Sequence, residues 1–114
     1  MRRKSGDALV KNEERVLAAA LALLNEGEPQ FHGYRLVKAF ETNPKLTVAM
    51  STLYRCLGRL EDRGLLAGKW RAPDADRDAR PIRFFHLTPD GVEKARDLDF
   101  TMVITGSSVR LIPN

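Results

Sequence analysis

The sequence contains one cysteine and two histidines among its 114 residues. A single cysteine excludes an internal disulfide framework and any zinc site that needs several thiolates. The apolar residues fall in short periodic runs, so none is long enough to cross a membrane as a helix. The run at residues 8–10 is also too short for the apolar part of a signal peptide. These absences predict a soluble, cytoplasmic protein with no membrane anchor.

Catalytic patterns are also missing. The sequence has no glycine-rich phosphate loop, no paired carboxylates on one face, and no nucleophile beside a base. His32 and His86 lie far apart in the chain, and ordinary capping, packing or surface roles are favoured over metal binding or catalysis. Cys56 is expected to be a small packed side chain and not a redox sensor. We therefore expect no enzyme activity, no cofactor and no metal.

The chain is basic and short. It has 19 Lys and Arg against 15 Asp and Glu, which gives a net charge of +4. This balance is compatible with an anionic partner. The length allows one domain with a modest core, and a partner subunit could add to its stability. Residues 1–11 form a basic N-terminal arm, which is either a solvated tail or a segment that contacts phosphate. The domain proper is expected over residues 12–90, and a C-terminal helix and tail over 91–114.

Three helices are predicted before Gly64. The first is expected to begin after Asn12 as N-cap and to stop at Gly27. It is apolar almost all round, so we expect burial on two sides, and a second subunit could supply one of them. The second spans residues 31–41, and the breaker run TNP ends it. The third spans residues 51–63 with Ser51 as N-cap, although residues 48–50 could add an irregular turn before it.

The third predicted helix has two different faces, because residues follow one another at about 100°. The core face is expected to hold Leu53, Cys56, Leu57, Leu60 and Gly64. The opposite face is expected to hold Thr52, Arg55, Arg59 and Arg63. Arginines along a rigid helix are either an ordinary solvated face or a surface for phosphates and base edges.

Two strands and a fourth helix complete the pattern. Alternation over residues 65–72 and the aromatic run 82–88 predict two strands, and the charged loop between them would make a wing. Arg77 and Arg80 in the loop and Arg83 in the second strand are candidate contacts to DNA backbone or minor groove, although aspartates oppose them. The aromatics expected in the core are Phe31, Phe40, Phe84 and Phe85.

The fourth helix should begin at Thr88 as N-cap with Pro89 in its first turn. We expect it to stop between residues 101 and 105. Residues 106–114 fit a disordered tail or a packed extended segment equally well. The predicted fold class is mainly α with a small β-hairpin (α+β), a winged helix-turn-helix with the order ααα-ββ-α.

Three sequence motifs occur in this order: HGYRL at 32–36, STLYRCLGRLEDRGLL at 51–66 and RPIRFFHLTPDG at 80–91. Together they closely resemble the PadR family of winged-helix transcriptional regulators, over about residues 15–98. The resemblance implies a homodimer, often a repressor, that binds double-stranded DNA with its third helix in the major groove. It also implies that Tyr54 and its neighbours approach the DNA, and that a small aromatic effector can loosen binding.

The sequence departs from the family at three places. Many members have proline in place of Arg55 and a basic residue in place of Gly58, and the long C-terminal dimer helix is short here. Dimerisation is therefore expected through the first helix and a truncated C-terminal helix. The alternative function is a winged-helix module that docks a protein without binding specific DNA. The predicted DNA contacts are Ser51, Thr52, Tyr54, Arg55, Arg59, Arg77, Arg80 and Arg83.

Overall fold

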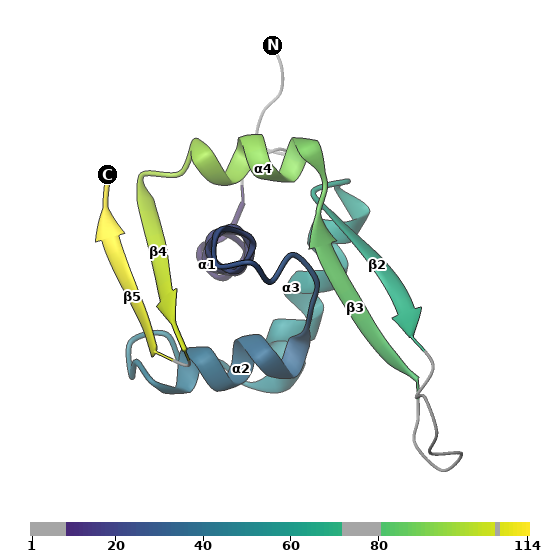
Figure 1. The fold of residues 1–114 in the computed structure, drawn as a ribbon, viewed down its shortest axis with the longest axis horizontal. Coiled ribbons are helices and arrows are strands. Elements are labelled where there is room, and N and C mark those ends of the chain that lie inside the picture. The colour runs from purple at the N-terminus through teal and green to yellow at the C-terminus, as the bar shows by residue number, and fades with distance from the viewer. Residues whose placement is uncertain (1–8, 72–80, 107) are drawn as a thin grey trace.

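The computed structural model describes residues 9–71, 81–106 and 108–114 (Figure 1). The helices are α1 (Lys11–Asn25), α2 (Gly33–Glu41), α3 (Met50–Asp62) and α4 (Pro89–Arg96). The strands are β1 (Phe31–His32), β2 (Leu66–Arg71), β3 (Ile82–Leu87), β4 (Phe100–Thr105) and β5 (Ser108–Pro113). The predicted α+β class and the order ααα-ββ-α are confirmed, with β1 added before α2 and a hairpin added after α4. None of the helices in these ranges is long and apolar enough to cross a membrane.

Helix α1 is the centre of the fold. Figure 1 shows it end on, with α4, the β4–β5 hairpin, α2 and α3 around it and the β2–β3 hairpin beyond α3. Its buried apolar side chains are Val16, Leu17, Ala18, Ala19, Ala20, Ala22 and Leu23. Burial on two sides is therefore confirmed, but strand β4 of the same chain covers the side for which a second subunit was an option.

The ends of α1 differ partly from expectation. The predicted N-cap at Asn12 is wrong: the N-cap is Val10, two residues earlier, and the helix begins at Lys11. The backbone N–H of Val10 donates to the Glu13 Oε1 atom at 3.1 Å, so a side chain inside the first turn satisfies a backbone group outside it. The stop at Gly27 is confirmed, because this glycine has a φ of 87°, a left-handed conformation that ends helices.

The three-stranded sheet has the order β1-β3-β2, and all its pairs are antiparallel. Phe31 in β1 pairs with Phe85 in β3, and both are buried with ring centroids 6.3 Å apart. Phe40 is also buried, as predicted. Phe84 is only half-buried, so its assignment to the core was wrong. Its side chain alternates to the outer face of the sheet, where the Arg71 guanidinium lies 3.9 Å from the ring centroid.

The predicted start of α4 at Thr88 is confirmed. The Thr88 Oγ1 accepts a hydrogen bond from the Gly91 N–H at 3.0 Å and donates one to the Gly64 carbonyl at 2.6 Å. Gly64 itself has a φ of 78° and ends the segment that follows α3. One hydroxyl therefore caps α4 and joins its start to the residue that follows α3.

The predicted extension of the fourth helix to residues 101–105 is wrong. Helix α4 ends at Arg96, and β4 pairs in a hairpin with β5, the strand that follows Gly106, whose φ is 62°. Alternate side chains of this segment are apolar, and those that face the core are Met102, Ile104 and Val109. A period of two favours a half-buried strand over a helix. For residues 106–114 the packed extended segment was therefore the better alternative.

Candidate nucleic-acid interface

Helix α3 begins earlier than predicted. Its N-cap is Ala49, whose carbonyl accepts the Leu53 N–H at 3.0 Å, and no side chain caps this end. Ser51 is therefore not the N-cap but an exposed residue of the first turn. The predicted core face is confirmed at Leu53, Cys56, Leu57 and Leu60, which are all buried. It is wrong at Gly64, which is exposed beyond the helix end.

The outer face of α3 carries most of the predicted DNA contacts. Ser51, Tyr54, Arg55 and Arg59 are exposed, and Thr52 is half-buried. At about 100° per residue, Ser51 and Arg55 lie opposite the buried leucines. Arg59 and Thr52 lie on one flank, and Tyr54 lies on the other. The structure therefore brings these five residues onto one convex surface, with Arg55 near its middle.

Tyr54 packs against the first residue of α2. A Cβ atom on Gly33 would lie 2.6 Å from Tyr54 Cζ and 2.8 Å from its hydroxyl oxygen, so only glycine leaves room for the ring. The side chain remains 43% exposed. The tyrosine is thus held between α2 and α3, and its open side is available to a ligand.

Arg59 is tied to α1. Its Nη1 atom lies 3.6 Å from the Glu13 Oε2 atom, and the glutamate side chain is 1% exposed while the arginine is 54% exposed. A buried carboxylate is stable when it is paired, and here the partner is an arginine at the surface. Glu13 falls at the spacing of Val16, Leu17 and Ala20, so its burial could have been predicted from the apolar stripe of α1.

Arg83 turns toward α3. Its Nη2 atom donates to the Glu61 Oε2 atom, and its guanidinium also lies 5.4 Å from the centre of the Trp70 ring. This pair joins β3 to α3, and Glu61 was not among the predicted site residues. A DNA contact by Arg83 stays a prediction. Arg77 and Arg80, like residues 1–8 of the basic arm, lie outside the described residues.

Cys56 is a packed side chain of the core face, as predicted. Its burial raises the pKa of the thiol, and the nearby Glu13 carboxylate raises it further. The thiolate form is thus disfavoured in the folded chain.

We expect a disulfide reagent to modify Cys56 more slowly in the native protein than in urea, by roughly tenfold or more. The raised pKa also makes stability depend on pH. The contribution is fully present below about pH 8.5, the ordinary pKa of cysteine, and is lost as the pH rises through the higher folded value. Urea unfolding from neutral to alkaline pH, compared with Cys56→Ala, measures this. An equal pH dependence in both proteins would contradict it.

His32 has the ordinary capping role that was expected. Its Nδ1 atom accepts the Arg35 N–H at 3.2 Å at the start of α2. Among the residues that the structure describes, no group of three or more His, Cys, Asp or Glu side chains is placed to hold a metal ion.

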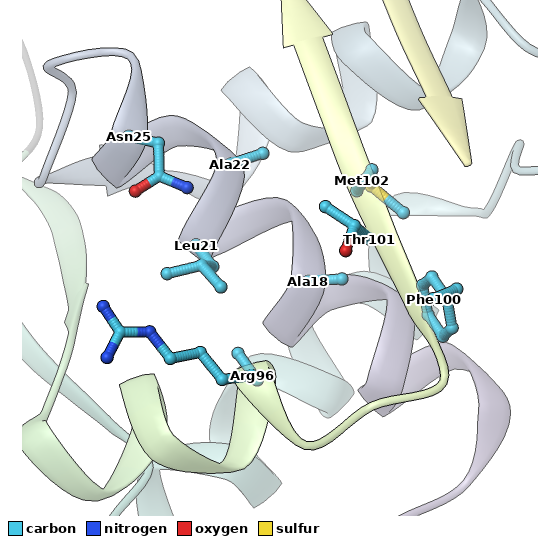
Figure 2. A pocket seen from close by; sticks show the side chains of 9 residues that line it. Ala18, Leu21, Ala22, Asn25, Arg96, Phe100, Thr101 and Met102 are labelled. Carbon is cyan, nitrogen blue, oxygen red and sulfur yellow. The ribbon is translucent and has the colours of Figure 1, made fainter. Parts of the chain in front are cut away.

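A hollow of about 250 Å³ lies between α1, α4 and β4 (Figure 2). Its floor is apolar, with Leu21 and Ala22 from α1 and Met102 from β4, and Arg96 and Asn25 lie at its rim. Its lining includes no carboxylate, histidine or cysteine. The lining of the hollow therefore lacks the paired acid and base of a hydrolytic site.

Comparisons with known proteins agree with this geometry. A profile of the transcriptional regulator PadR-like family matches residues 20–97, which is more than half of the chain. A PadR family transcriptional regulator from Eggerthella lenta is similar in structure, with 26% identity, a TM-score of 0.52, and coverage of 73% of this chain and 71% of that one. The circadian clock associated protein Pex from Anabaena has the same fold, with 24% identity, a TM-score of 0.58 and coverage of 77% and 73%. No curated protein sequence matches significantly.

Proposed function

The chain belongs to the PadR-like family of transcriptional regulators, and from that premise we propose that it binds specific double-stranded DNA sites through α3 in the major groove. We propose further that it acts in the cytoplasm as a homodimer and a repressor. The observation that carries the proposal is the exposed Arg55 at the middle of the outer face of α3. The opposite face of this helix is buried in the core, so the arginine is presented on a rigid support.

Each exposed side chain of α3 suits a different contact. Arg55 can form two parallel hydrogen bonds to the O6 and N7 atoms of guanine, worth about 1–3 kcal/mol of discrimination. Ser51, Thr52 and Tyr54 can donate hydroxyl hydrogen bonds to phosphate, which set the register of the helix without reading sequence. Arg59 and Arg83 already pair with carboxylates, so in this proposal they contribute less phosphate attraction than their charge indicates. Wing contacts by Arg77 and Arg80 are part of the proposal.

The proposed dimer keeps the predicted C-terminal helix as its contact and relies less on α1 than the sequence predicted. The apolar face of α1 is covered within the chain, and α4 has only eight residues. We place the subunit contact over α4 and the adjoining hollow (Figure 2). A small aromatic effector, which the family resemblance implies, would fit the same hollow, where it could alter the distance between two α3 helices.

Selection of bound duplexes from a random pool tests the function and the dimer together. We expect a recovered site with two half-sites about 10 base pairs apart, because two recognition helices of a dimer enter successive major grooves. Affinity for that site should exceed affinity for a random duplex by about 10³-fold or more, and both should fall steeply with salt. No enrichment, or equal affinity for both duplexes, would contradict sequence-specific binding. A single recovered half-site would contradict the dimer alone.

A further inference from the structure

The Glu13 carboxylate connects the start of α1 to α3. Its Oε1 atom accepts the Val10 N–H at 3.1 Å, and its Oε2 atom lies 3.6 Å from Arg59 Nη1 on α3. The side chain is 1% exposed, so it cannot reach DNA itself. It is the one buried charged residue among the described residues. Because taking a charge out of water is costly unless it is paired, Glu13 has a strong preference for keeping Arg59 beside it.

The pair changes what Arg59 can offer to DNA. A guanidinium near a carboxylate has part of its charge neutralised, so it attracts phosphates anywhere on a duplex less strongly. Its rotamers are also restricted, because one edge of the group is directed toward α1. The rest of the guanidinium remains accessible, since the side chain is 54% exposed. Glu13 thus acts on both the strength and the direction of an arginine at the edge of the DNA-facing surface.

We propose that Glu13 is a positioning residue for DNA recognition, which holds Arg59 in one orientation and limits its attraction to non-specific DNA. This inference rests on the proposed function, because it concerns the same surface. Removal of the carboxylate leaves the Arg59 charge without its nearby counter-charge and lets the guanidinium turn toward any phosphate. Non-specific affinity then rises while the preference for the selected site falls, a combination that simple loss of structure does not produce.

The test uses Glu13→Gln in the full chain. Glutamine has the same shape and keeps an oxygen that can accept the Val10 N–H, but it lacks the charge that holds Arg59. We expect the slope of log affinity against log salt to steepen by about 0.9 on a random duplex of ~21 base pairs, as one additional phosphate is neutralised. We expect the ratio of selected-site to random-duplex affinity to fall by about threefold or more.

Two controls separate the explanations. Glu14→Gln removes the same charge from the same turn of α1, but this residue lines a different hollow, beside Lys94 and Leu98 of the α4 region, and it should leave the ratio unchanged. In an Arg59→Ala background, Glu13→Gln should no longer alter either the slope or the ratio. Thermal unfolding of each variant shows that the compared proteins are folded.

The outcomes are distinct. The inference is overturned if Glu13→Gln leaves slope and ratio unchanged, or if it changes them equally with and without Arg59, since the carboxylate would then act through its own field. A fall in both affinities together would assign Glu13 a purely structural role and would also overturn it. If the unaltered protein binds neither duplex, the proposed function itself fails, which is a separate result.

Discussion

Replacement of Gly91 by alanine is expected to lower the free energy of unfolding by about 3 kcal/mol, at the upper end of the usual range for overpacking. A Cβ atom at this position would overlap the backbone carbonyl oxygen of Leu65 and would lie 3.0 Å from Leu87 Cδ2. The Leu65 oxygen cannot move freely, because it accepts the Thr88 N–H at 3.1 Å. The new methyl group can therefore be accommodated only if α4 moves away from the start of the wing.

Gly58→Ala is the matched control, because it makes the same chemical change in the interior of a helix. A Cβ at Gly58 meets no heavy atom within 4 Å, so alanine should stabilise α3 by about 0.5–1 kcal/mol through its higher helix propensity. Urea unfolding followed by far-ultraviolet circular dichroism compares the two variants. Equal stability of Gly91→Ala and the unaltered protein would show that α4 does not pack on Leu65 as described.

Arg55→Ala should lower affinity for the selected DNA site by about 10- to 100-fold, the loss of one good base contact of about 1–3 kcal/mol. Its effect on stability should be small, because Arg55 is exposed on the far side of α3 from the core. Affinity is measured by fluorescence anisotropy with a labelled duplex at two salt concentrations. Arg55→Lys is the matched variant: it keeps the charge but cannot form the bidentate contact, so it should restore non-specific binding more fully than specific binding.

Unchanged DNA affinity in Arg55→Ala would count against major-groove binding by α3 and would favour the alternative of a winged-helix module that docks a protein. The Arg59→Ala variant cannot be used in place of Arg55→Ala in this test. Removal of Arg59 leaves the Glu13 carboxylate buried without its partner, so both stability and affinity should fall. A double substitution of both arginines would therefore confuse loss of fold with loss of a contact.

Three side-chain contacts hold α3 in a fixed orientation, and they therefore fix the positions of the side chains on its outer face. Tyr54 packs on Gly33 of α2, Arg59 pairs with Glu13 of α1, and Glu61 pairs with Arg83 of the wing. Each contact joins α3 to a different element, so the orientation of the helix depends on the whole domain. A recognition helix that is fixed in this way loses less conformational entropy on binding.

The sequence by itself determined the features that depend on neighbouring residues. The apolar spacing of α3 predicted its buried face, Gly27 and Gly64 predicted where segments stop, and Thr88 with Pro89 predicted the start of α4. These predictions were correct because helix periodicity, capping and left-handed glycine are local properties of the chain. The three sequence motifs between residues 32 and 91 were also sufficient to predict the family.

Tertiary structure alone decided which surfaces meet. Periodicity showed that α1 is buried on two sides, but not that its own C-terminal hairpin would cover the second side. Periodicity also placed Arg59 on an exposed face. It did not show that the buried carboxylate of Glu13, which is far away in the sequence, lies beside this arginine. Such pairings depend on how helices and strands pack in three dimensions. A buried charge is stable only beside an opposite charge, so the packing determines which residue becomes its partner. That is why the buried and exposed faces of α3 could be predicted from residues 51–63, while the pairing of Arg59 with Glu13 could not.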